Sequence, residues 1–101
     1  METPPTELPA DAHYVRTTPR LTAETTPAGL LRSHRVAEGA WAVVRVLTGT
    51  VHFAFEDATE HGTFELSAGA QLVVPPGRPH HVEPVPGCEF EIDFHRVGAP
   101  E

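Results

Sequence analysis

The side chains of this chain that could do chemistry are imidazoles and carboxylates. The sequence has seven histidines and fourteen acidic residues but a single cysteine, Cys88. It can therefore build neither an internal disulfide nor a Cys-x-x-Cys zinc site. Two imidazoles with one or two carboxylates are a sound ligand set for Zn²⁺, Fe²⁺, Mn²⁺ or Ni²⁺. If the protein holds a metal, we expect a divalent ion bound through histidine and acidic side chains.

Residues 69–80 place one of these histidines where a site could form. They read Gly-Ala-Gln-Leu-Val-Val-Pro-Pro-Gly-Arg-Pro-His. The first glycine predicts a turn, residues 70–74 a strand, and Pro75 with Gly77 a sharp reversal of the chain. That reversal would aim the imidazole of His80 into the mouth of a barrel.

Short strands separated by turns must position these side chains. No segment combines a helical period of apolar residues with a cap, and turn-forming residues recur at short intervals. Apolar patterning predicts strands over residues 41–47, 51–55, 61–66, 71–74 and 89–95, with edge strands over 13–18 and 22–26 and a turn at 27–29. This spacing indicates an all-β fold, a small barrel or sandwich that could enclose one ligand.

The length of 101 residues leaves room for one domain. Residues 1–12 are rich in proline and predict a flexible arm, residues 13–97 the domain and 98–101 a tail. A small sandwich has exposed strand edges, and pairing them across a two-fold axis would cover them. We therefore expect a homodimer.

The composition excludes several classes of protein. The net charge is −7 and there is no lysine, so the chain should repel phosphate backbones and bind no nucleic acid. No apolar run approaches the length of a membrane span. The N-terminus lacks the basic and apolar regions of a secretory signal, so we expect a cytoplasmic protein.

Two resemblances sharpen these expectations. Residues 69–80 fit the second cupin motif, which is a Gly, five residues, a Pro, one residue, a Gly, two residues and a His. The chain from Tyr14 to Arg96 also resembles the TehB/YeaR-like family of cupin-like domains, named from tellurite resistance. That resemblance is carried by residues 25–31, His34, 38–41, 47–49, 75–76, 79–80, 82–84 and 91–94.

The resemblance implies a single cupin-like jelly roll with a divalent metal in its mouth. His34 and His80 would be metal ligands. The first cupin motif usually supplies two histidines and a glutamate, whereas this chain has no His-x-His pair, so Glu83 and Asp93 would complete the site. Some relatives carry this domain ahead of a methyltransferase domain, for which no residues remain here, so that activity does not transfer.

Strand alternation sets a structural alternative against each of these ligands. Only one of His80 and His81 can point into the pocket, and the motif selects His80. The same period of two places Glu83 opposite His80 unless a bulge intervenes. It also makes Asp93 a candidate for the solvent face of the last strand, and His34 could be an exposed loop residue.

Other side chains are candidates for the pocket wall or for plain structure. Trp41, Phe53, Phe55 and Phe90 could line an apolar pocket, although Trp41 also suits the core. Arg45 interrupts an apolar strand and could bind an anionic ligand, pair with an acid such as Glu91, or simply point outward. The remaining residues with a structural interpretation are His13, His52 and His61, expected at the surface, and Cys88, expected to be inert.

Three functions follow as hypotheses. The first is a small stand-alone metal-binding protein, which the family resemblance links to tellurite or other oxyanion stress, or to oxidative or nitrosative stress. The second is a metal-free module that binds a small molecule or anion. The third is a metal-dependent dioxygenase.

Overall fold

The alternating apolar residues form most of the strands that the sequence predicts, and residues 80–84 form one more. The computed structural model describes residues 5–58 and 62–98. The strands are β1 (His13–Thr17), β2 (Leu21–Thr22), β3 (Ala40–Thr48), β4 (Thr50–Phe55), β5 (Thr63–Ser67), β6 (Gln71–Val74), β7 (His80–Pro84) and β8 (Glu89–Arg96). One short 3₁₀ helix, η1 (Ala28–Leu30), precedes β3. Within the described ranges, no helix is long and apolar enough to cross a membrane.

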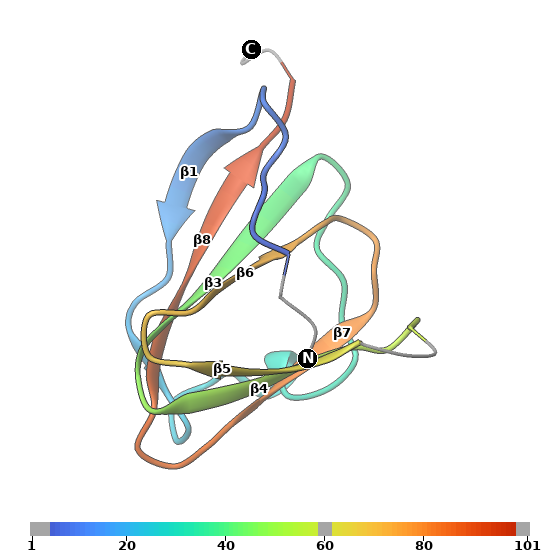
Figure 1. Ribbon diagram of the computed structural model, residues 1–101. Coiled ribbons are helices and arrows are strands. Elements are labelled where there is room, and N and C mark those ends of the chain that lie inside the picture. The colour runs from blue at the N-terminus through green and yellow to red at the C-terminus, as the bar shows by residue number, and fades with distance from the viewer. Residues whose placement is uncertain (1–4, 59–61, 99–101) are drawn as a thin grey trace.

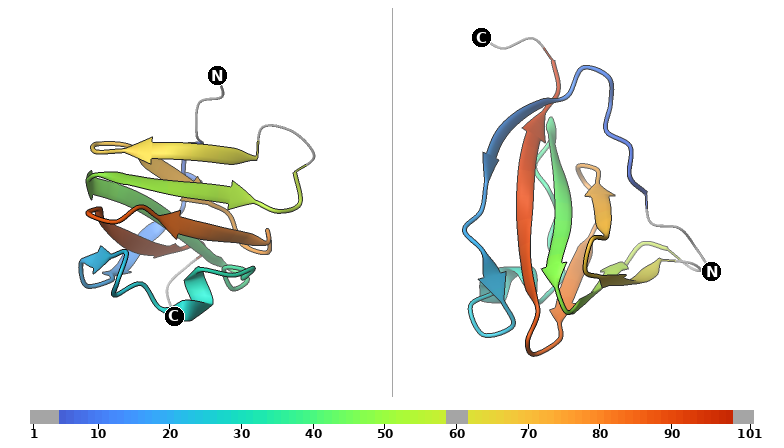
Figure 2. Two further views of the ribbon diagram at one scale, coloured as in Figure 1. Left: turned by 90° about the horizontal axis from the view of Figure 1, so that it is seen from below. Right: turned by 60° about the vertical axis from the view of Figure 1, so that its left-hand side comes forward.

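The strands form two antiparallel sheets, which confirms the all-β sandwich (Figure 1). In one sheet the order is β1-β8-β3-β6, with β2 also paired to β8; in the other it is β5-β4-β7. The long strands β8 and β3 lie side by side with β1 next to β8 (Figure 2, right). We call these two layers the large sheet and the small sheet.

The core lies between the sheets and uses one face of each strand. In β4, Val51, Phe53 and Phe55 are buried while the alternate residues are less so. The burial of β3 is less regular, because Val43 on its outer face is buried as well. The chain passes from the large to the small sheet at Gly49, whose φ is +72° and whose missing Cβ would lie 2.8 Å from the Cα of Cys88. Only glycine fits that corner without strain.

Two local features differ from the sequence prediction. The edge strand expected over 22–26 is instead a turn after β2, because threonine hydroxyls bond the local backbone there. The Oγ1 of Thr26 donates to the carbonyl of Thr22 at 2.6 Å, and the N–H of Thr22 donates to Thr25 Oγ1 at 2.9 Å. The return strand expected from His61 is β5, which begins at Thr63; His61 lies outside the described residues.

The sheet edges and the segment before β1 bear on two further expectations. Strand β1 is an edge of the large sheet, where Tyr14 and Val15 are exposed. The homodimer expected from such edges stays a prediction. In the segment expected to be a flexible arm, the carbonyl of Pro5 accepts a hydrogen bond of 2.7 Å from the N–H of Val73 in β6.

Candidate functional site

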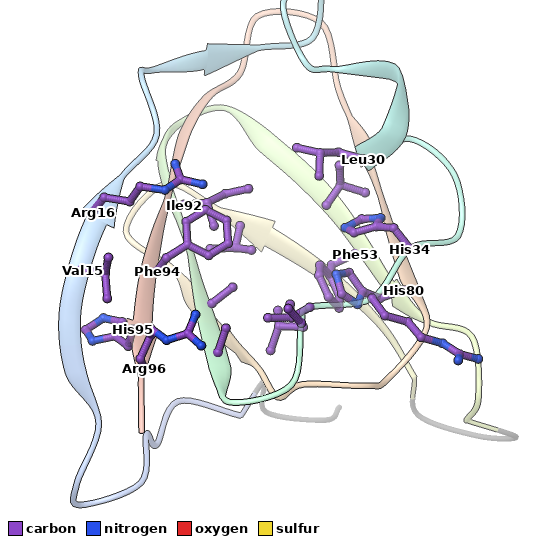
Figure 3. A pocket seen from close by; sticks show the side chains of 18 residues that line it. Val15, Arg16, Leu30, His34, Phe53, His80, Ile92, Phe94, His95 and Arg96 are labelled. Atoms are coloured by element: carbon purple, nitrogen blue, oxygen red, sulfur yellow. The ribbon is translucent and has the colours of Figure 1, made fainter. Parts of the chain in front are cut away.

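A cavity of about 370 Å³ opens between the two sheets. This is near the lower end of the range of roughly 300–1,000 Å³ typical of ligand pockets. Most of its wall is apolar: Val15, Leu30, Val36, Ala37, Ala40, Ala42, Val44, Phe53, Val74, Val82, Ile92 and Phe94. In Figure 3, His34 and His80 lie together beside Phe53, whereas Arg16 and Arg96 lie on the other side.

Backbone pairing holds the two histidines side by side. His80 begins β7, and His34 lies in the segment before β3; each donates its N–H to the carbonyl of the other, at 2.9 and 3.0 Å. Gly77, with φ at +81°, donates its N–H to the carbonyl of Val36 at 3.1 Å. The reversal after β6 thus returns the chain along residues 34–36. The two imidazole centroids are 4.1 Å apart.

Hydrogen bonds to the backbone define the tautomer of both rings. His34 Nδ1 lies 2.9 Å from the carbonyl oxygen of Arg32, and His80 Nδ1 lies 2.8 Å from that of Arg78. A carbonyl oxygen can only accept, so each Nδ1 donates, and each neutral ring carries its lone pair on Nε2. Among residues 5–58 and 62–98, neither Nε2 has a hydrogen-bond partner. Each can accept a hydrogen bond or ligate a metal.

Burial favours the neutral form of His80. The residue is 3% exposed, and the ring of Phe53 stacks on it with 5.2 Å between centroids. Desolvation is the main cause that lowers the pKa of His80, and the neighbouring His34 lowers it further. His80 therefore presents a lone pair rather than a positive charge near neutral pH.

Among residues 5–58 and 62–98, the cavity wall contains no acidic residue. Its polar members are all basic: Arg16, His34, Arg35, His80, His95 and Arg96. In the part of the chain that the structure describes, no group of three or more His, Cys, Asp or Glu side chains could hold a metal ion. The structure brings together His34 and His80, and among the described residues no carboxylate joins them as a third ligand.

Asp93 lies on the outer face of the large sheet. Ile92 and Phe94, its neighbours on β8, line the cavity, so the carboxylate of Asp93 points away from it. Asp93 accepts hydrogen bonds of 2.6 Å from Arg45 Nε and 2.6 Å from Thr17 Oγ1. Arg45 is the main cause that lowers the pKa of Asp93. Asp93 thus forms an ion pair on the outer face of the large sheet, whereas His34 and His80 lie at the cavity on the other face.

Glu83 also lies outside the cavity. Its carboxylate is 2.9 Å from Nε2 of His81, whose Nδ1 is 2.6 Å from Glu56. These two carboxylates, Glu56 first, raise the pKa of His81. The bulge needed to turn Glu83 toward His80 does not occur, because β7 pairs with β4 in an unbroken register.

Of the five side chains predicted to line the pocket, only Phe53 does so. Phe55 and Phe90 are buried core residues outside the cavity wall. Trp41 and Arg45 fall on the outer face of β3, because the alternate residues of that strand line the cavity. Arg45 pairs there with Glu91 at 2.8 Å as well as with Asp93, one of the alternatives that the sequence left open.

Sequence reasoning missed the arginines of the cavity, Arg16, Arg35 and Arg96. Arg96 had a signal, because it continues the row of inward residues that begins at Phe90. Arg16 had none, since the register of β1 against β8 shifts between Tyr14 and Arg16. Arg35 lies in an irregular segment with no period to follow.

The chain is similar in sequence to one domain family and in structure to several solved proteins. The model of the TehB-like domain family matches residues 16–92. A crystal structure of a protein from E. coli strain K12 is 27% identical, covers 95% of this chain and 99% of its own, and has a TM-score of 0.79. TehB from Haemophilus influenzae is 21% identical with a TM-score of 0.76; the match covers 87% of this chain but only 32% of TehB.

More distant likeness shows the fold alone. A cupin-2 domain containing protein from Shewanella frigidimarina is 22% identical with a TM-score of 0.53, and the match covers 92% of this chain and 76% of that one. No curated protein matches the sequence.

Proposed function

The chain belongs to the TehB-like domain family and has a cupin-like fold, and from that premise we propose that it is a binding module for a small molecule held in the cavity beside His34 and His80. One observation carries the proposal: His34 and His80 lie side by side at the apolar wall of a ligand-sized cavity, and within residues 5–58 and 62–98 neither Nε2 atom has a hydrogen-bond partner. A few placed polar groups in an apolar hollow are typical of small-molecule sites. The role needs no metal and no catalytic step.

The two Nε2 atoms suggest what one end of the ligand carries. An imidazole lone pair accepts a hydrogen bond and cannot donate one. The complementary group is a hydroxyl or an N–H. A phenol or alcohol could donate its one hydroxyl hydrogen to either ring, and the two rings lie close together, with 4.1 Å between their centroids.

A metal site at the same histidines is the second candidate. The observation that favours it is the pair of Nδ1–H···O=C bonds, since a metal-ligating histidine usually donates its other ring N–H in this way. The donor set is incomplete, however, because metal sites of the zinc type use three or four protein ligands and the described residues supply two. His34 and His80 therefore suit a divalent ion only if a further ligand comes from outside the described residues. We derive no reaction through such an ion, and a dioxygenase would need the same missing donor.

The link to tellurite or related stress rests on family membership alone. Tellurite is therefore one of the compounds to be tested, beside organic ligands.

Binding of phenol, followed by NMR, tests the proposed function. We expect phenol to shift the resonances of His34, His80 and Phe53, with and without EDTA. His34→Gln should weaken this binding, and His52→Gln on the outer face of β4 is the matched control. Long-range ¹H–¹⁵N spectra of the free protein should show both rings protonated at Nδ1.

The metal candidate makes the opposite predictions. A divalent ion that copurifies at about one per chain, survives dialysis and is lost in the His34→Gln/His80→Gln variant would replace the metal-free proposal. If phenol shifts no resonance of the cavity residues and no divalent ion copurifies, both the binding proposal and the metal candidate are refuted.

A further inference from the structure

The charges around the cavity are sorted by sign. The chain has fourteen acidic residues and seven arginines, for a net charge of −7. Yet the part of the cavity wall that the described residues form includes Arg16, Arg35 and Arg96 and no acidic residue. A cavity lined by one sign of charge raises the local concentration of ligands of the opposite sign. In an acidic protein, this basic opening is a local departure from the overall charge.

Two arginines of the cavity wall, Arg16 and Arg96, differ from Arg45 and Arg78 in their ion-pair partners. Arg45 pairs with Asp93 and Glu91, and Arg78 pairs with Asp57 at 2.9 Å. Within residues 5–58 and 62–98, neither Arg16 nor Arg96 forms an ion pair. Their guanidinium N–H groups, which are donors only, remain available to a carboxylate.

The strands hold these two guanidinium groups over the cavity. Arg16 pairs with Phe94 across β1 and β8, and its guanidinium carbon lies 4.5 Å from the Phe94 ring centroid. Arg96, at the exposed end of β8, continues the row of residues that lines the cavity and pairs with Ala40. Beside it stands Gly39, where an added Cβ would be only 3.7 Å from the Arg96 guanidinium. Figure 3 shows Arg16 and Arg96 on the side of the cavity away from His34 and His80.

The cavity thus has two polar ends and an apolar middle. The arginine end donates hydrogen bonds and carries positive charge, and the histidine end accepts hydrogen bonds. Resting on the proposed function, we propose that the ligand is a small organic anion: its acidic group binds Arg16 and Arg96, its apolar body covers Ile92 and Phe94, and a hydrogen-bond donor at its far end reaches the histidines.

An apolar body is part of the proposal because most of the wall is aliphatic or aromatic. An inorganic oxyanion could accept hydrogen bonds from the arginines, but it would leave the apolar wall of the cavity exposed to water. Inward-pointing charges at a sheet edge can also serve only to prevent edge-to-edge association. Protection of an edge needs no ligand and no particular sign of charge. A preference for anionic ligands therefore distinguishes a binding role of the arginines from edge protection.

A matched series of three compounds tests the sign of charge. 4-Hydroxyphenylacetate, 4-hydroxyphenylacetamide and tyramine share a phenol and differ in carrying a carboxylate, a neutral amide or an ammonium group. We expect the carboxylate to bind at least about tenfold more tightly than the amide, which corresponds to about 1.4 kcal/mol, and tyramine to bind most weakly, since hydrogen bonds between charged groups are stronger than those between neutral ones. The preference should shrink as salt is added.

Substitution of the arginines locates the effect. Arg16→Gln/Arg96→Gln should reduce the affinity for the carboxylate to near that for the amide. The urea unfolding midpoint of the variant, compared with that of the unsubstituted protein, shows that the variant is folded. Arg20→Gln, which removes a charge outside the cavity wall, should change neither. Sodium tellurite and sodium nitrate are tested as inorganic competitors of 4-hydroxyphenylacetate.

The outcomes separate this inference from the proposed function. If none of the phenols shifts the cavity resonances, the binding function itself is wrong. If the phenols bind but carboxylate and amide are equal, or the arginine variant keeps the preference, the function stands and the anion inference is overturned. If tellurite or nitrate binds the cavity as strongly as 4-hydroxyphenylacetate does, the claim that the ligand has an apolar organic body is refuted.

Discussion

Replacing Asp93 by asparagine separates the ligand role implied by family resemblance from the ion-pair role seen in the structure. If Asp93 were a metal ligand, Asp93→Asn would impair the site and have little effect on folding. In the structure, Asp93 accepts hydrogen bonds from Arg45 Nε at 2.6 Å, from the terminal guanidinium nitrogen at 3.0 Å and from Thr17 at 2.6 Å. We therefore expect Asp93→Asn to destabilise the protein and leave the cavity unaffected.

The contacts set the size of the effect. Asparagine keeps one acceptor oxygen but loses the charge and directs an NH₂ group toward Arg45 or Thr17. A hydrogen bond to a charged group contributes about 1.5–3 kcal/mol, and solvent screening reduces this where the pair is partly exposed. The side chains of Arg45 and Asp93 are 28% and 16% exposed. We expect a loss of about 1–2 kcal/mol, which for a domain of this size lowers Tm by roughly 5–15 °C.

The pH dependence of the loss gives a second check. Arg45 lowers the pKa of Asp93 in the folded state, so the stabilisation is present above the unfolded pKa of about 3.9 and is lost as pH falls through the lower folded value. Wild type and Asp93→Asn should thus differ at pH 7 and converge in strong acid.

Urea unfolding monitored by the fluorescence of Trp41, the single tryptophan, measures this difference. Glu65→Gln, at an exposed position of β5, is the control and should have no effect. Phenol binding to the cavity should be the same in all three proteins. Unchanged stability together with lost binding or lost metal would refute the assignment of Asp93 to the outer face.

Three further changes test the corner, the surface histidine and the cysteine. Gly49→Ala should cost about 2–4 kcal/mol in urea unfolding, because the residue needs a positive φ and its Cβ would meet Cys88; Gly69→Ala, which has positive φ but open space, should cost clearly less, and equal losses would contradict the clash. Because carboxylates raise the pKa of His81, its stabilisation is present below the unfolded pKa and lost as pH rises through the folded one; His81→Gln should lower the urea midpoint more at pH 6 than at pH 9, and a larger loss at pH 9 would reverse the sign. Cys88 is 1% exposed and burial raises its pKa, so a maleimide should label it only in denaturant, and rapid labelling of the native protein would contradict that burial.

The sequence was sufficient for the fold because the information is local. The alternation in residues 51–55 and 89–95 marks strands with one buried face, and the proline pair after Val74 marks where β6 ends. The sequence was also sufficient to place His80 at the cavity, since the reversal formed by Pro75 and Gly77 lies within the five residues before it. His34 came from family resemblance, and the structure pairs it with His80 by two backbone hydrogen bonds. Whether these histidines bind a metal stays a prediction.

Only the tertiary structure decided which polar side chains share the cavity. A strand residue can point to either face until the register is known, and one step along the strand exchanges core for surface. That parity puts Asp93 beside Arg45 and Glu83 beside His81, while Arg96 turns inward. The pairing of segments far apart in the chain, β1 with β8 and residues 34–36 with the turn before β7, then places arginines and histidines around one apolar space. Sequence patterns record the period of a strand, but the sign of charge that a cavity presents depends on which strands close around it.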